Sequence, residues 1–330
     1  MTCADYSSIS DRRHSAVSVS RLWVIMLLAL TLGHADRADG QERNVSIRFA
    51  AEVGDKASVV IRRSRTPGQL GGAKDQLTMV ATYAMEVTGK SADGYRILWT
   101  PQSINFEGAP EGAAAQLKAL AAAAMIPIEF DADASGMPIK IADRERALSR
   151  AIEALGKLGN LDPGIVGQVR SMFATMDERT LALIFAKEAA MLAKWQQADL
   201  VVGTSNELEE TRPNPFGGSE IKGTVKAAVT APTAEMIRID WRTEIDPAVM
   251  LADMIAFLKQ MAARAGRPPG EVEAQLADAR LTFEESGATE VNVSDGWARA
   301  ASLTRSVRIQ SPSRSENRDE LFDIKLTRER

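Results

Sequence analysis

The clearest alternation of hydrophobic and polar positions runs through residues 77–106, LTMVATYAMEVTGKSADGYRILWTPQSINF. Two alternating runs flank Ser-Ala-Asp-Gly at residues 91–94. A period of two is typical of a strand with one buried face, and Asp-Gly favours a hairpin turn because glycine tolerates a positive φ. The pattern therefore predicts a long antiparallel hairpin whose buried face carries Tyr83 and Trp99.

A second copy of this pattern occupies residues 220–245, EIKGTVKAAVTAPTAEMIRIDWRTEI. The segment RILWT at residues 96–100 matches RIDWR at residues 238–242. Each hairpin is followed by a helical stretch and then by shorter strands. We interpret the chain as an internal duplication of a β-rich unit.

Helical periodicity separates the two hairpins. Apolar residues recur at three- and four-residue steps after Asp143, a good N-cap, then after Asp162, and again over residues 178–197. The predicted fold class is α+β. Two related antiparallel β-rich units, residues 36–142 and 200–330, would enclose a helical insertion at residues 143–199 and form a half-open barrel or a clasp.

The second unit contains further expected elements. Helices are predicted at residues 247–265 and 269–278, and strands at residues 280–285, 290–294, 298–309 and 321–327. Ser286-Gly287 and Asp295-Gly296 would be the turns between the first three strands. The composition of residues 206–219, NELEETRPNPFGGS, predicts a loop.

The N-terminus predicts a signal peptide. Three arginines precede an apolar run at residues 22–32, which is shorter than the roughly 20 residues that span a bilayer but suits a signal-peptide core. Gly33, His34 and Ala35 offer small residues where a signal peptidase reads. We expect cleavage after Ala35, with Gly40 as the alternative, and a soluble periplasmic product; an uncleaved N-terminal anchor is the other interpretation.

The predicted leader, residues 1–35, holds the one cysteine and both histidines of the chain, Cys3, His14 and His34. The mature chain would therefore lack disulfides, thiolate nucleophiles, catalytic triads with histidine and zinc sites of the Cys/His kind. No cofactor is expected. A lipoprotein would need a cysteine just after the apolar run, and none is there.

Charge and hydropathy narrow the class of partner. The chain has a formal net charge of −4, and 45% of its residues are hydrophobic, but it has no basic block. This balance argues against nucleic acid and anionic membrane surfaces as partners. No later segment is long and apolar enough for a transmembrane helix. An apolar small molecule or another envelope protein remains as the expected partner.

One segment resembles the start of a calcium loop. Asp131, Asp133 and Ser135 offer oxygen ligands at alternate positions, and Gly136 stands sixth. The twelfth position is Ala142, where a bidentate glutamate is needed. We therefore favour an acidic hairpin turn over a metal site, with these residues as the candidate ligands.

Aromatic residues are the candidates for ligand binding. Trp99 and Trp241 share a register in the two hairpins, so they are either equivalent core residues or the walls of a cleft between the halves. Phe216 stands in the loop at residues 206–219 and could form a binding tip or part of a structural turn.

Paired carboxylates offer the alternative of glycoside hydrolysis, which needs one acid and one base or nucleophile. The candidate pairs come from two acidic clusters: Glu207, Glu209 and Glu210; Glu284 and Glu285. Solvated surface charge is the simpler interpretation of both clusters. No catalytic residue is assigned.

The arrangement resembles a family of uncharacterised bacterial envelope proteins, many of them lipoproteins. The matching features are the hairpin at residues 83–102, the Ala/Leu-rich helix at 117–125, the strand, D-x-x-G and strand at 128–141, and the motifs at 216–218 and 295–297. The resemblance implies an exported, β-rich protein and no activity. The missing lipid-attachment cysteine departs from the lipoprotein members.

The sequence thus predicts an exported protein that binds an apolar ligand or a protein partner without catalysis. The lack of thiol and imidazole groups in the mature chain favours this hypothesis. A carboxylate-dependent hydrolase of wall glycans and a structural or assembly module are the alternatives.

Overall fold

The computed structural model describes residues 43–66, 77–108, 117–118, 121–122, 124–157, 167, 170–171, 173–174, 176–212, 220–231, 233–264, 268–311 and 314–329. These residues all belong to the unit Arg43–Arg330. The predicted signal peptide, Phe216 and part of the Ala/Leu-rich helix at residues 117–125 lie outside the described residues.

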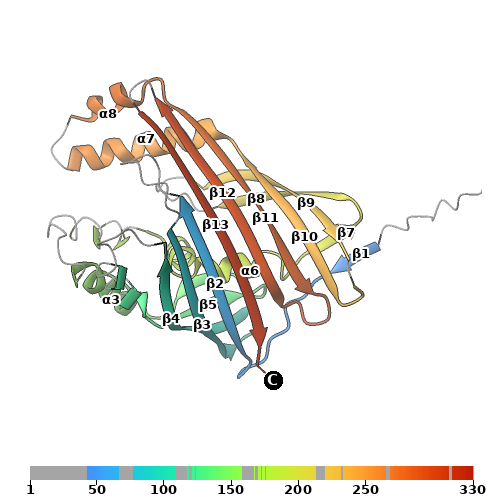
Figure 1. Ribbon diagram of the computed structural model, residues 1–330. Coiled ribbons are helices and arrows are strands. Elements are labelled where there is room, and N and C mark those ends of the chain that lie inside the picture. The colour runs from blue at the N-terminus through green and yellow to red at the C-terminus, as the bar shows by residue number, and fades with distance from the viewer. Residues whose placement is uncertain are drawn as a thin grey trace, which may run out of the picture. The chain divides into compact units, whose positions relative to one another are not determined.

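One antiparallel sheet of 11 strands dominates this unit (Figure 1), in the order β6-β5-β4-β3-β2-β13-β12-β11-β10-β9-β8. A separate two-stranded sheet pairs β1 with β7. The strands are β1 (Arg43–Ser46), β2 (Lys56–Thr66), β3 (Leu77–Lys90), β4 (Gly94–Glu107), β5 (Ile128–Asp133), β6 (Pro138–Ile141), β7 (Asp199–Val202), β8 (Ser205–Arg212), β9 (Ile221–Thr230), β10 (Met236–Ile245), β11 (Arg280–Asn292), β12 (Ala298–Ser311) and β13 (Arg314–Arg328).

Both predicted hairpins are present. β3 pairs with β4 and β9 pairs with β10, each antiparallel and in consecutive order. At Gly94 a Cβ atom would lie 2.0 Å from the carbonyl oxygen of Ala132 on β5, so only glycine fits this corner. The strands of both predicted β-rich units join in one sheet, since β13 pairs with β2, which lies beside it in Figure 1. Whether the two hairpins arose by duplication stays a prediction.

Five helices are described in full: α3 (Arg144–Lys157), α5 (Glu178–Phe185), α6 (Lys187–Ala193), α7 (Pro247–Arg264) and α8 (Pro269–Leu276). Asp143 accepts a hydrogen bond from the backbone N–H of Arg146 at 3.0 Å, which supports its predicted N-cap role. The predicted continuous helix at residues 178–197 is wrong, because it breaks at Ala186, where φ is −121° and ψ is 38°.

Two further predictions are corrected by the sheet. The predicted loop at residues 206–219 begins as an edge strand, β8, whose acidic composition hid its strand character. The predicted turn at Ser286-Gly287 lies inside the 13-residue strand β11. Gly287 allows Trp241 and the backbone of β12 to pack closely against β11, because a Cβ atom would lie 2.6 Å from the ring of Trp241 and 2.2 Å from the carbonyl oxygen of Ser302.

We call the face of the sheet that packs on α6 the inner face. It holds the two buried clusters of the core, which are large and apolar. One cluster gathers β2 to β5 with Phe49, Trp297 and α6, and the other gathers β9 to β13 with Ile47, Trp195 and Leu200. Burial of these side chains supplies the main stabilisation of the unit.

Candidate functional site

The two ends of the sheet are built differently. At one end, which we call the turn end, short connections follow β3, β9 and β11, and the core clusters lie against them. At the other end, the long-connection end, long segments follow β2, β4 and β10; α7 and α8 are among them (Figure 1). Longer connections carried by a rigid scaffold are where binding residues concentrate.

The turn end is filled. Phe49, Trp99 and Leu192 surround a residual void of only about 10 Å³. This volume is about one water molecule at most. This void is therefore too small for a ligand.

The long-connection end keeps apolar side chains half exposed on the inner face. They form two groups on opposite sides of β2 and β13, as the strand register shows. We call them the β3–β4 strip, with Leu77, Met79, Ile104 and Phe106, and the β11–β12 strip, with Leu281, Phe283, Val307 and Ile309.

α7 lies at the same end and contacts β11 and α8. None of its described side chains is buried, and Val249 and Leu258 are 47% and 37% exposed. An amphipathic helix in an isolated unit normally buries its apolar face. The partly exposed strips and this helix therefore leave an incompletely covered apolar region at the long-connection end, among the described residues.

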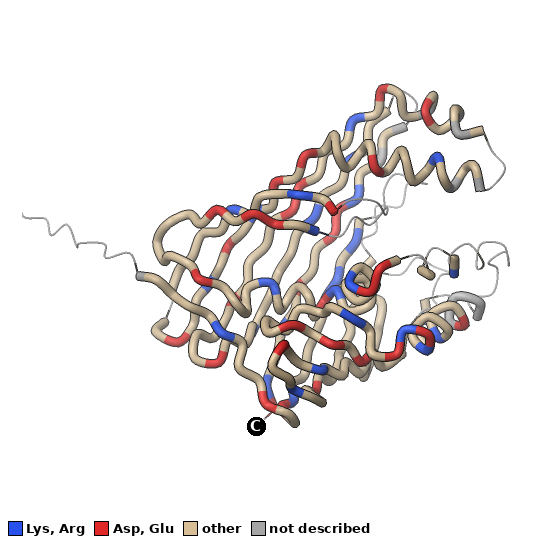
Figure 2. The backbone as a smooth tube through the Cα atoms, turned by 180° about the vertical axis from the view of Figure 1, so that it is seen from behind, with Lys and Arg blue, Asp and Glu red and all other residues tan. Residues whose placement is uncertain are grey.

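A continuous series of ion pairs crosses the inner face between the core and the strips; we call it the charge ladder. Figure 2 shows that Lys/Arg and Asp/Glu positions lie on neighbouring strands of the sheet. Its members are Lys194, Glu210, Arg212, Glu285, Arg305, Glu320, Arg63 and Arg318. Each of its three carboxylates contacts at least two cations.

Glu285 is the centre of the ladder. Its side chain is 1% exposed and pairs with Arg212 and Arg305, each at 2.6 Å. Arg212 comes from the edge strand β8, so its side chain reaches across the inner faces of β9 and β10 and also donates to Thr243 at 3.0 Å. Burial raises the pKa of Glu285, but the two guanidinium groups outweigh it and hold this pKa at about 2.

Glu320 repeats this arrangement two strands away. It accepts from Arg63 at 2.9 Å and from Arg318, and Arg305 lies 4.0 Å away. Burial opposes the charged form, yet hydrogen bonds from Arg318 and Arg63 lower the pKa of Glu320 to about 2. Both carboxylates are thus ionised at neutral pH and serve as anchors for arginines.

Two lysines lie at the ends of α6, and one of them, Lys194 at its C-cap, belongs to the ladder. Lys194 pairs with Glu210 at 3.1 Å, and its Nζ lies 3.9 Å from the ring centroid of Trp241. Lys187 pairs with Glu188 at 3.5 Å. Burial lowers the pKa of both lysines, and in Lys194 the neighbouring Arg212 adds to this effect.

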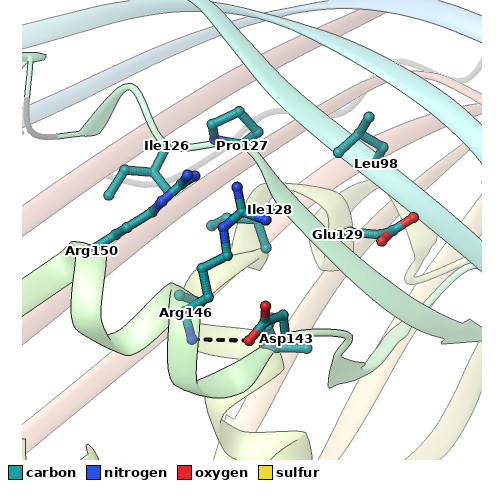
Figure 3. Close-up of a pocket in the computed structure, with 10 residues that line it drawn as sticks. Leu98, Ile126, Pro127, Ile128, Glu129, Asp143, Arg146 and Arg150 are labelled. Atoms are coloured by element: carbon teal, nitrogen blue, oxygen red, sulfur yellow. Dashed lines mark hydrogen bonds between the residues drawn. The ribbon is translucent and has the colours of Figure 1, made fainter.

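A separate pocket of about 250 Å³ lies where β5 begins, beside α3 (Figure 3). Ile126, Pro127 and Ile128 give it an apolar side. Figure 3 shows the guanidinium groups of Arg146 and Arg150 beside this apolar side.

The charges that line this pocket are balanced. Arg146 and Arg150 face Glu129 and Asp143 in the lining, two cations against two carboxylates. Glu129 accepts a hydrogen bond from the Thr88 hydroxyl at 2.9 Å, and Asp143 caps α3. The pocket has the volume for a small ligand, but it offers neither the apolar area nor the charge of the inner face.

The structure places the two predicted tryptophans in different clusters. Trp99 is 5% exposed and stacks near Tyr83, with ring centroids 5.5 Å apart. Trp241 is 7% exposed, packs over Gly287 and belongs to the other cluster. Both side chains are buried on the inner face, each in its own cluster, and a role in ligand binding stays a prediction. Phe216 lies outside the described residues.

The candidate calcium ligands are engaged locally. Asp131 accepts from Arg96 at 2.9 Å. Asp133 accepts from the backbone N–H groups of Ser135 and Met137 at 2.8 and 3.1 Å, which is the geometry of an acidic turn. No group of three or more acidic, histidine or cysteine side chains suited to a metal ion occurs within the described residues.

The fold separates the members of each acidic cluster considered for hydrolysis. Glu207, Glu209 and Glu284 are exposed, whereas Glu210 and Glu285 both pair with Arg212. A general acid for glycoside hydrolysis needs a raised pKa. The lowered pKa of Glu285 is the opposite of this requirement.

Sequence reasoning missed most of the charge ladder. The arginines of β2, β12 and β13 alternate with apolar residues. Arg63, Arg305 and Arg318 occupy positions that the alternation assigns to the inner face, and this pattern could have indicated them. Which carboxylate would neutralise each one depends on strand order, which the pattern does not contain.

A search of the described residues for a helix of membrane-spanning length and hydropathy found none. No protein-family model matches the chain, and neither does any curated protein.

Two solved structures show weak similarity. One is lipovitellin, from a study of its lipid–protein interactions, with 10% identity and a TM-score of 0.41 over 84% of this chain. The other is an outer membrane channel from Pseudomonas putida F1, with 9% identity and a TM-score of 0.16; the match covers 85% of this chain and 98% of the channel. The match covers 25% of the lipovitellin chain, so this chain spans about a quarter of its length.

Proposed function

We propose that this protein is exported and binds an apolar ligand, without catalysis, on the inner face of its sheet at the long-connection end. The observation that carries the proposal is the pair of partly exposed apolar strips on the inner face, beside a core whose void at Phe49, Trp99 and Leu192 is only about 10 Å³. The leader at residues 1–35 supports export to the periplasm.

The size of the strips supports a ligand with a hydrocarbon chain. Eight apolar side chains on four strands share one face. Covering them would recover about 25 cal/mol for each Å² removed from water. Exposed apolar area gathered on one face in this way marks an interaction site more often than scattered apolar residues do.

The test uses the uncharged fluorescent probe N-phenyl-1-naphthylamine and the purified chain. Two variants, Phe106→Ser and Phe283→Ser, remove one aromatic ring from each strip. The matched controls are Val60→Ser and Leu321→Ser, which change apolar residues that are 43% and 46% exposed on the outer face of β2 and β13.

We expect saturable binding by the unmodified chain, a loss of roughly tenfold in affinity in at least one strip variant, and no loss in the controls, since only the strips would lose buried apolar area. Circular dichroism checks that all variants fold. Absence of saturable binding, or an equal loss in the controls, would refute the proposal.

A further inference from the structure

The inner face carries more positive than negative charge. The described side chains around the charge ladder on this face, on α6 or at its C-cap comprise seven cations and four carboxylates. They are Arg63, Arg65, Lys187, Lys194, Arg212, Arg305 and Arg318 against Glu188, Glu210, Glu285 and Glu320. An excess of three positive charges therefore gathers beside a buried core, where charge is costly unless it is paired.

The excess is most accessible at Arg65 and Arg318. Arg65 is exposed, and neither a hydrogen bond nor an ion pair connects it to any part of the chain that the structure describes. Arg318 is 47% exposed and shares Glu320 with Arg63. Partial burial and the like charges of Arg318 and Arg63 lower the pKa of Arg65, although Glu320, which lies opposite it across β2 and β13, acts in the other direction.

Apolar side chains stand directly beside these cations on both sides. Arg65 is paired with Leu77 across β2 and β3, and Arg318 with Val307 across β13 and β12. Cβ atoms of such directly opposed residues lie about 4.5–5.5 Å apart. A ligand with its charged end between Arg65 and Arg318 would thus place its apolar part on the β3–β4 strip or the β11–β12 strip.

We propose that the ligand is an anionic amphiphile, whose acidic headgroup is held by Arg65 and Arg318 and whose hydrocarbon chain lies on an apolar strip. This inference rests on the proposed function and adds the ligand class. Guanidinium groups bind carboxylate and phosphate oxygens through short, charge-assisted hydrogen bonds. A fatty acid and an acidic phospholipid share the required chemistry.

The experiment compares two probes that differ only in charge, 11-(dansylamino)undecanoic acid and its methyl ester, by fluorescence titration of the purified chain. The test variant is Arg65→Gln with Arg318→Gln. The matched control is Arg62→Gln with Arg308→Gln, which removes the same charge from exposed positions on the outer face of β2 and β12. Circular dichroism confirms that both variants fold.

We expect the acid to bind the unmodified chain at least about tenfold more tightly than the ester, which is the effect of one charge-assisted hydrogen bond. The test variant should lose this preference but keep its affinity for the ester, and the control should keep both. Displacement of the acid probe by oleate or by lysophosphatidylglycerol then separates a carboxylate from a phosphate source.

Equal affinity for acid and ester would overturn the inference and leave the proposed function standing. Failure of both probes to bind would overturn both. A preference for the acid that survives in the test variant, or that disappears equally in the control, would show that Arg65 and Arg318 do not hold the headgroup. Displacement of the acid probe by uncharged monoolein as readily as by oleate would also contradict the inference.

Discussion

The substitution Glu285→Gln tests the charge ladder directly. The carboxylate is 1% exposed and neutralises Arg212 and Arg305, so the variant leaves two partly buried guanidinium groups without their shared anion. The pKa of Glu285 is held at about 2, against the ordinary value of 4.5. At 1.36 kcal/mol per unit, this difference corresponds to about 3 kcal/mol of folding free energy at neutral pH.

The contribution of Glu285 to folding stability should decrease at acidic pH. Because the folded pKa of Glu285 is lowered, the unfolded chain binds more protons between about pH 4.5 and pH 2, and the contribution is lost as the pH falls through that range. The difference in stability between the unmodified chain and Glu285→Gln should therefore be full at pH 7. It should fall to roughly 1.5 kcal/mol at pH 3.

Urea unfolding followed by tryptophan fluorescence at pH 7, 5, 4 and 3 measures this difference. Glu284→Gln is the matched control, because the neighbouring carboxylate is exposed on the outer face of the same strand, and its loss should change stability by less than about 0.5 kcal/mol. A loss below about 1 kcal/mol in Glu285→Gln at pH 7, or a loss independent of pH, would refute the reasoning.

Two further predictions concern the packing beside the ladder. Gly287→Ala should lower the free energy of unfolding by about 1–3 kcal/mol, because the new Cβ would lie 2.6 Å from the ring of Trp241. The control Gly270→Ala should not destabilise, because its Cβ would meet nothing within 4 Å. The midpoints of urea unfolding measure both effects. Lys194→Met should leave stability within about 1 kcal/mol of the unmodified chain or raise it, because burial already disfavours the charged lysine and an arginine still pairs with Glu210. A loss above about 2 kcal/mol in thermal unfolding of Lys194→Met would contradict this.

The local elements were largely predictable because their signals are local. The alternation over residues 77–106 and the Asp-Gly turn indicate β3 and β4, and the second hairpin matches β9 and β10. Asp143 likewise marks the start of α3. In each case a period or a cap within a few residues contains the information.

Gly287 shows where local signals mislead. A Ser-Gly pair favours a turn, but this glycine lies in the middle of β11 to make room for a tryptophan from the neighbouring strand. The acidic residues of β8 mislead in the same way. Their composition predicts a loop, but an edge strand also tolerates charged side chains.

The site itself was beyond sequence reasoning. Arg63 and Glu320 pair at 2.9 Å although 257 positions separate them, because β13 returns beside β2. The ladder depends on this order of strands, as does the position of Arg65 between two apolar strips. Alternation indicates which side chains face inward, but not which of them meet.

The most direct test of the account is where a ligand binds. Photo-crosslinking with a palmitic acid that carries a diazirine near its chain end, followed by peptide mass spectrometry, locates the contact. We predict adducts on peptides with Phe106, Phe283 or Val307, which excess unlabelled palmitate removes. Competable adducts confined to the outer-face residue Val60, or to the pocket at Ile126, would contradict binding on the inner face.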